Sequence, residues 1–173
     1  MEADKIDTFS LYYNELEDRI KLSVELGEGV EDMHFWLTRR LSLRLLDATV
    51  DLLQQTSRRV SKTPYEHRSA MALFEHQVAQ LNQARTLSEA VRDNTKVEGE
   101  INILRRLDIS FHKRRYKLSF FLNDTSNAVA STVIGSQALH QLVYLIHTGA
   151  TALDWGVDKL LFTTEDEQKR VLQ

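Results

Sequence analysis

The sequence predicts an α+β fold in which two similar βββα units, related by an internal pseudo-twofold axis, are joined by a helical segment. The first observation is a repeat: the tripeptide Lys-Leu-Ser at 21–23 recurs at 117–119, a shift of 117 − 21 = 96 residues. The second is that, at this one shift, the alternating apolar residues of 20–26 fall on those of 116–122. The third is that in both places the apolar period changes from two to between three and four, as expected where strands give way to a helix.

The first unit, residues 1–60, is predicted to hold three strands and a helix. Apolar and polar residues alternate over 9–13, 19–26 and 31–37, which is typical of strands with one buried face. Glycines between the second and third of these segments allow a tight turn. The helix that follows shows apolar residues at spacings of three and four, namely Leu43, Leu46, Val50 and Leu53.

Residues 61–98 are predicted to be a helical connector. Thr63, Pro64 and Glu66 combine an N-cap, a proline at the first helical position and a capping-box acid. A second helix start is predicted at 86–89, and a linker at 94–100. The buried stripe of the connector is predicted to comprise Leu73, Phe74, Val78 and Leu81.

The second unit, residues 99–162, repeats the plan with strands predicted near 106–112, 116–122 and 129–133. A helix then starts near 136, with an apolar stripe formed by Leu139, Leu142, Ile146, Ala150 and Leu153. Residues 163–173 are a polar tail. We expect the two units to share one core and to form one compact domain.

Composition excludes several classes of protein. The 173 residues include no cysteine, which removes disulfides and thiolate chemistry and is compatible with a reducing cytoplasm. No apolar run is long enough to span a membrane, and we expect a cytoplasmic protein with no membrane association. The formal net charge of −3 argues against a long nucleic-acid site.

The sequence predicts no catalytic residue, no metal ligand and no bound cofactor, and therefore no enzyme. It holds neither a nucleophile elbow nor a glycine-rich phosphate loop. His140, Tyr144 and His147 share one face of the last helix, but no acidic residue joins them there. We interpret these three residues as a polar face or an interface stripe.

A basic hairpin is the strongest local signal. The aromatic residue Phe121 breaks the strand alternation and lies on the same face as Lys117, which is typical of a platform on which single-stranded bases stack. The alternative is a solvated turn with internal ion pairs, in which Phe121 is buried. The residues of the platform would be Arg105, Arg106, Lys113, Arg114, Arg115, Lys117 and Phe121.

A second candidate interface lies where the third strand meets the first long helix, at Trp36, Arg39 and Arg40. Positive charge at a helix N-terminus opposes the macrodipole. We expect a carboxylate from Glu15, Glu17 or Asp18, or a partner's acidic group, to offset it. Trp36 would then be either a core residue or an exposed contact.

The segments Glu-Asp-Arg-Ile at 17–20 and Trp-Leu-Thr-Arg-Arg at 36–40 resemble an uncharacterised family of small bacterial proteins. Its members share an acidic-Arg-apolar strand start and a Trp-Leu-Thr-Arg-Arg strand-to-helix junction. The resemblance covers roughly residues 10–55 and implies no activity, cofactor or site residue.

These observations predict a non-catalytic binding or assembly module that holds a protein partner, or a second copy of itself, through its sheet faces or edges. The alternative is a single-stranded nucleic-acid-binding protein that uses the basic hairpin around 105–117. An enzyme acting on a small molecule is a distant third.

Overall fold

The computed structural model describes residues 4–5, 8–25, 29, 31–82, 91–92, 101–123, 126–159 and 161–162. The strands are β1 (Asp4–Lys5), β2 (Thr8–Asn14), β3 (Arg19–Glu25), β4 (Met33–Leu37), β5 (Val91–Arg92), β6 (Asn102–Ile103), β7 (Arg106–His112), β8 (Arg115–Phe121) and β9 (Ala130–Ile134). The helices are α1 (Arg39–Thr56), α2 (Arg58–Lys62), the short 3-10 helix η1 (Tyr65–His67), α3 (Arg68–Leu81) and α4 (Ser136–Ala152).

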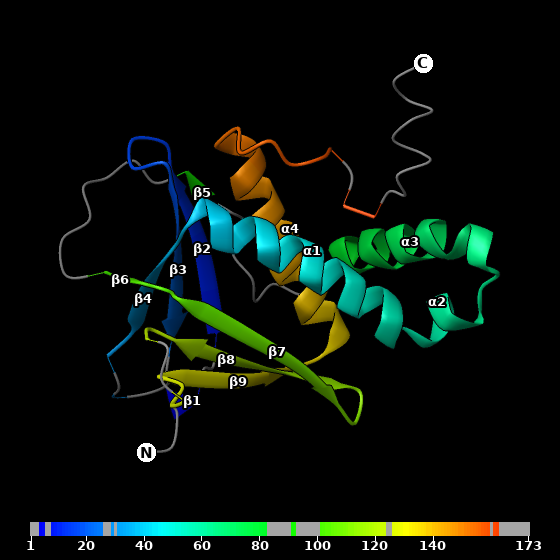
Figure 1. Ribbon diagram of the computed structural model, residues 1–173, viewed down its shortest axis with the longest axis horizontal. Helices are drawn as coiled ribbons and strands as arrows, with labels where there is room; N and C mark the ends of the chain where they lie inside the picture. The colour runs from blue at the N-terminus through cyan, green and yellow to red at the C-terminus, as the bar shows by residue number, and fades with distance from the viewer. Residues whose placement is uncertain are drawn as a thin grey trace.

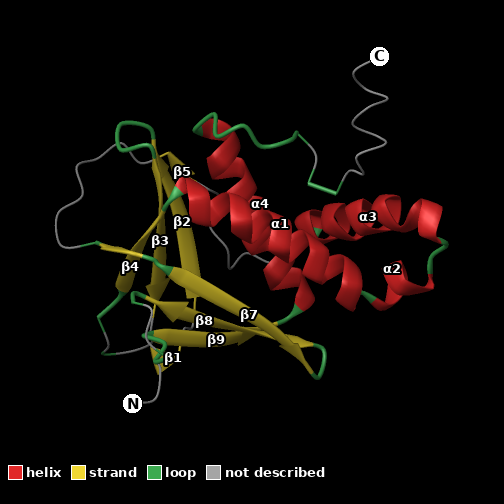
Figure 2. Cartoon of the chain, viewed as in Figure 1, coloured by secondary structure: helices red, strands yellow, loops and turns green. Residues whose placement is uncertain are grey.

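The fold is α+β, as the sequence predicts, with two sheets on one side of the molecule and the helices on the other (Figures 1 and 2). The predicted order of strands followed by a helix is found at both ends of the described chain. The antiparallel strands β2, β3 and β4 precede α1, and the antiparallel strands β7, β8 and β9 precede α4.

Three short strands, β1, β5 and β6, were not predicted. Each has only two residues, too few to show an apolar period, and each is defined by parallel pairing with a distant strand. β5 corrects the prediction of a wholly helical connector over 61–98, because it pairs with β2. The predicted helix start at 86–89, the linker at 94–100 and the polar tail lie outside the described residues.

The two sheets are connected through strands that pass from one to the other. The five-stranded sheet has the order β5-β2-β3-β4-β6, and the four-stranded sheet has the order β1-β9-β8-β7. β1 pairs in parallel with β9, whereas β2 belongs to the other sheet; β6 pairs in parallel with β4, whereas β7 belongs to the other sheet. Each half of the chain therefore supplies a strand to the sheet of the other half.

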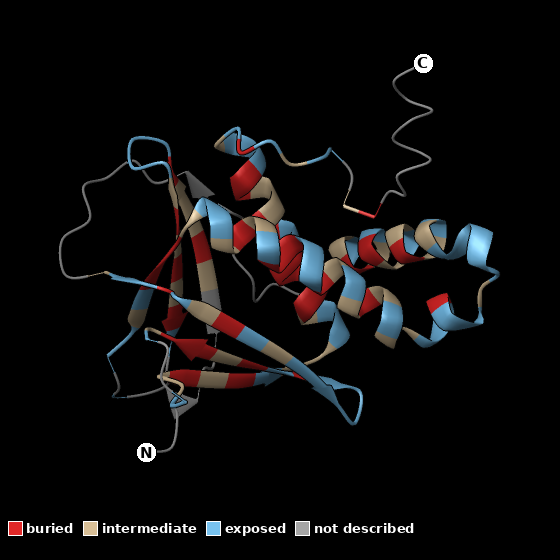
Figure 3. Cartoon of the chain, viewed as in Figure 1, coloured by how far each residue is buried: buried red, intermediate tan, exposed pale blue. Residues whose placement is uncertain are grey.

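The core lies where the two sheets face the helices, as the buried residues of Figure 3 indicate. In β3 and β8 the alternation predicted from the sequence is confirmed, because every second residue is buried. Phe35 of β4 and Phe120 of β8 stack with their ring centroids 5.8 Å apart, which joins the two sheets across the core.

Helix α4 crosses the sheet of the other half. It packs against β2 and β3 as well as against α1, whereas α1 packs against β7. Gly149 of α4 permits this approach, because a Cβ there would lie 3.0 Å from Cδ1 of Ile20 and 3.6 Å from Cδ2 of Leu11. Ile20 and Leu11 are fully buried, so neither can easily move aside.

The buried face of α3 differs from the predicted one. Phe74 and Leu81 are 52% and 86% exposed, and the buried residues of this helix are Ala72, His76 and Ala79. Small residues allow α3 to lie close to its neighbours α2 and α4. Of the predicted stripe, Leu73 is partly buried against the core, whereas Phe74 and Leu81 lie outside the buried face.

We predict that Gly149→Val destabilises the protein by about 1–3 kcal/mol, because the added methyl groups overpack the contact with Ile20. Ala152→Val, at an exposed position of the same helix, is the control and should change stability by less than about 0.5 kcal/mol. Urea unfolding of both variants measures the difference. Equal effects of the two substitutions would contradict the close approach of α4 to β3.

Candidate functional site

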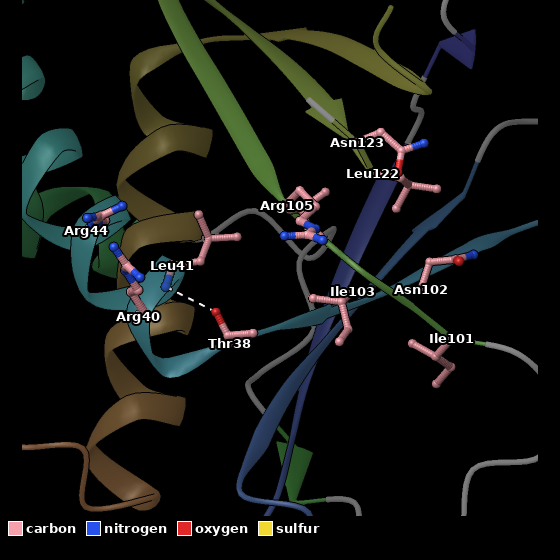
Figure 4. A pocket seen from close by; sticks show the side chains of 11 residues that line it. Thr38, Arg40, Leu41, Arg44, Ile101, Asn102, Ile103, Arg105, Leu122 and Asn123 are labelled. Carbon is pink, nitrogen blue, oxygen red and sulfur yellow. Dashed lines mark hydrogen bonds between the residues drawn. The ribbon is translucent and has the colours of Figure 1, made fainter. Parts of the chain in front are cut away.

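A groove of about 790 Å³ opens between the start of α1, β6 and the residues that follow β8. Figure 4 shows side chains from all three segments around it. The lining residues are Thr38, Arg40, Leu41, Arg44, Ile101, Asn102, Ile103, Leu104, Arg105, Leu122 and Asn123.

The N-cap of α1 positions two of its arginines. Oγ1 of Thr38 accepts a hydrogen bond of 3.3 Å from the backbone N–H of Leu41, which fixes the first turn of the helix. Arg40 and Arg44 are four residues apart and therefore lie on the same face of α1. Both side chains are exposed and reach the groove.

A third arginine comes from the strand that changes sheets. Arg105 lies between β6 and β7, and its backbone N–H donates a 3.0 Å hydrogen bond to the carbonyl of Phe121 at the end of β8. This bond holds the crossover segment in place. In Figure 4 the Arg105 side chain lies at the centre of the groove, between α1 and β6.

The groove is positively charged. Among the residues that the structure describes, its lining includes three arginines and no Asp or Glu. Within the part of the chain that the structure describes, none of the three arginines forms an ion pair. Arg40 also lies in the first turn of α1, which contains no acidic residue to balance the helix dipole. An anion is therefore the chemical group that this groove would attract most strongly.

The internal ion pair expected for the start of α1 is not formed by the described carboxylates. Asp18 instead accepts a 2.7 Å hydrogen bond from Nε1 of Trp155, and Arg39 donates to the Trp155 carbonyl at 3.1 Å. Trp155 follows α4, and its neighbours Asp154 and Gly156 both have positive φ angles. Arg39 thus anchors the segment after α4 and leaves the charge of Arg40 unbalanced.

Apolar and amide groups accompany the arginines. Ile103 is 47% exposed at the groove, and Leu41 and Leu122 are half-buried. The amides of Asn102 and Asn123 offer both donors and acceptors. The groove can therefore hold a ligand that has apolar as well as anionic groups, which a free inorganic anion would not fill.

The predicted basic platform is divided in the structure. Arg105 lies at one end of β7, while Lys113, Arg114 and Arg115 lie at the hairpin beyond its other end (Figure 1). A strand of this length spans about 20 Å or more, so the two ends cannot contact one small ligand together. Lys117 and the hairpin residues are exposed, and the structure places them away from the groove.

Phe121 does not provide an exposed stacking surface. It lies on the outer face of its sheet, as its position in the sequence indicates, but it is only 6% exposed. The guanidinium of Arg106 covers it at 3.9 Å from the ring centroid and pairs with Asp108 at 3.2 Å. Phe121 is therefore buried, as in the alternative, and of the predicted basic residues Arg106 pairs internally, with Asp108.

Trp36 is a core residue in the structure. It is buried, and the guanidinium of Arg19 lies 5.7 Å from the centroid of its ring. The sequence could not decide between burial and exposure, because the side chain points to the outer face of the sheet. Of the three residues singled out at this junction, only Arg40 lines the groove.

His140, Tyr144 and His147 share one face of α4, but this face packs against the protein's own chain. His140 is buried against His76 of α3, with the two Nδ1 atoms 3.2 Å apart, and Phe162 packs on both rings. Nε2 of His147 is 2.6 Å from the carbonyl oxygen of Asp158. Tyr144 alone is exposed, with its ring 6.2 Å from that of His76. An external partner cannot reach His140.

The hydrogen bond between His76 and His140 requires both rings to be neutral or only one to be charged, because one Nδ1 must offer a lone pair. Burial lowers the pKa of His140 to about 4. Burial, followed by the proximity of His140 and His147, lowers the pKa of His76 to about 4. No group of three or more His, Asp or Glu side chains that could hold a metal ion occurs among the residues described.

The composition of the groove cannot be predicted from the sequence, which assigns Arg40 and Arg105 to two different surfaces. The residues are 65 positions apart in the sequence (105 − 40 = 65), and only the parallel pairing of β6 with β4 brings them together. The unbalanced arginines at a helix N-terminus were the only signal available from the sequence.

No family model, curated protein or solved structure matches the chain. The resemblance to an uncharacterised bacterial family therefore stays a prediction. No described helix combines the length and the apolar character that crossing a bilayer requires.

We predict that acid destabilises the protein through the buried histidine pair. In the unfolded chain the two histidines bind a proton near pH 6.5, whereas in the folded chain they stay neutral down to about pH 4. The contribution of the neutral pair to the free energy of unfolding is therefore complete above pH 6.5. It is lost as the pH falls toward 4, by about 1.4 kcal/mol per pH unit for each histidine.

The comparison is with the double variant His76→Leu/His140→Leu, in which two buried apolar side chains that cannot bind protons replace the imidazole rings. Its free energy of unfolding in urea should fall less between about pH 7 and about pH 5 than that of the natural protein. The same pH dependence in both proteins would contradict this prediction.

Proposed function

We propose that this protein is a non-catalytic binding module that holds a protein partner, and that the groove between α1 and β6 receives an acidic segment of that partner. The observation that carries this proposal is the set of three arginines, Arg40, Arg44 and Arg105, without a carboxylate among the described lining residues. A carboxylate forms paired hydrogen bonds with a guanidinium, and these bonds are about twice as strong as neutral ones.

The energetics of α1 support the same proposal. Arg40 in the first turn costs about 0.3–1 kcal/mol through the helix dipole. No internal ion pair of the described residues recovers this cost. A bound acidic group would recover it, because it would meet both the arginine and the positive end of the helix.

We further propose that the two halves of the chain are copies of one βββα unit. The start of β8 follows that of β3 by 115 − 19 = 96 residues, and their ends differ by 121 − 25 = 96. The ends of α1 and α4 also differ by 152 − 56 = 96 residues. The reciprocal pairing of β1 with β9 and of β6 with β4 supports the same twofold relationship.

The rival function is single-stranded nucleic-acid binding, since guanidinium groups also bind phosphates. The composition disfavours it, with a net charge of −3, and Phe121 is not available for stacking. Self-association through the same groove is a second rival. The absence of cysteine supports a location in the cytoplasm.

We predict that a fluorescent peptide in which Glu and Val alternate binds the protein, and that Arg40→Glu/Arg44→Glu weakens its affinity about tenfold or more. Fluorescence polarisation measures the affinity, and added salt should weaken binding. The substitutions remove two cations that face the groove. They should not unfold α1, because an acidic residue near a helix N-terminus is favourable.

The matched control is Arg114→Glu/Arg115→Glu at the hairpin. Both double variants change the formal net charge from −3 to −7, because each Arg-to-Glu substitution changes it by −2. The control should bind the peptide like the natural protein. If an oligothymidylate bound instead and the hairpin variant abolished its binding, the nucleic-acid function would replace the one proposed. Equal loss of peptide affinity in both variants would show a general charge effect and contradict the groove.

A further inference from the structure

The edge of β6 that lies away from β4 borders the groove, and the backbone N–H and C=O groups on this edge face it. β6 is the last strand of the described five-stranded sheet, with β4 on one side of it. The N–H of Leu104 donates a 3.0 Å hydrogen bond to the carbonyl of Trp36 in β4. Backbone groups alternate in direction along an extended strand, so the N–H and C=O of Ile103 point away from β4.

The next residue confirms this alternation. Arg105 donates its N–H to the carbonyl of Phe121, on the side opposite β4. β8 ends at Phe121, so within the described residues it pairs with β7 and does not extend beside β6. The space next to Ile103 is the groove, lined on its far side by Leu122 and Asn123.

We infer that the acidic segment of the partner binds as an extended strand added to the free edge of β6. This inference rests on the proposed function and specifies the form of the ligand. Main-chain hydrogen bonds to Ile103 would hold the segment, and the arginines of α1 would select its side chains. The occupant is thus an extended segment of another protein, with acidic and apolar residues in alternation.

The spacing of the arginines fits such a strand. Arg40 and Arg44 are four residues apart, about 6 Å along the axis of α1. Residues i and i+2 of a strand are separated by about 6.6 Å and point to the same side. Helix α1 packs against β7, and the two run alongside each other in Figure 1. Acidic residues at alternate positions can therefore meet successive arginines, while the residues between them lie toward Ile103 and Leu122.

Backbone N-methylation of the peptide tests this inference without changing the protein. Two versions of the Glu-Val peptide would be methylated at alternate amides, one set at the Glu residues and the other at the Val residues. The two sets of amides point to opposite sides of a strand. Strand addition predicts that one version loses affinity about tenfold or more, while the other binds within about threefold of the parent peptide.

The outcomes separate the inference from the proposed function. If both methylated peptides bound like the parent, strand addition would be overturned, and the acidic groove would remain. If the unmethylated peptide did not bind, both would fail. Light scattering of the protein alone shows whether a second copy occupies the edge; a concentration-dependent dimer broken by Arg40→Glu/Arg44→Glu would replace the external partner.

A variant of the protein gives an independent result. Ile103→Pro removes the one backbone N–H of β6 that points into the groove and leaves the bond from Leu104 to Trp36 in place. The variant should keep its circular dichroism spectrum and lose peptide affinity about tenfold or more. Ile103→Val, which keeps the N–H and a similar side chain, is the control and should bind normally. Unchanged affinity in a folded Ile103→Pro protein would overturn strand addition.

Discussion

The segment that holds β6 and β7 passes from the five-stranded sheet to the four-stranded sheet, and the rest of the structure depends on this passage. Leu104 bonds to Trp36 of β4, and the adjacent Arg105 bonds to Phe121 of β8. Two neighbouring residues thereby tie both sheets together at the point where the strands diverge. A strand can pair on both sides only where both neighbours are present, and among the described strands only β4 pairs with β6. The groove is a consequence of this geometry.

The groove gathers three arginines around one concave site. Several described cations elsewhere have a role within the protein: Arg106 covers Phe121, Arg19 lies over Trp36, and Arg39 holds the segment after α4. Arg40, Arg44 and Arg105 have no such contact with the other described residues. A solvated arginine is common on any protein surface. Three that line one concave site beside an edge strand of the described sheet are the basis on which we propose a binding surface for acidic groups.

The core is held together by contacts other than those of the groove's arginines. The contact of α4 with β2 and β3 depends on a glycine, and the stacked Phe35 and Phe120 fill the space between the sheets. The buried histidine pair between α3 and α4 belongs to the same packed region. Changes at the groove can therefore be separated experimentally from changes in folding, since its arginines are exposed and contribute little to the core.

The sequence by itself determined the α+β class and the alternation of buried residues in β3 and β8, because these depend on local periodicity. It also flagged the unbalanced arginines of α1. Only the tertiary structure decided the buried face of α3, the burial of Phe121 and Trp36, and the two-residue strands. These depend on which distant segments meet, and local patterns carry no such information. The groove belongs to the second group, since the parallel pairing of β6 with β4 places Arg105 beside α1.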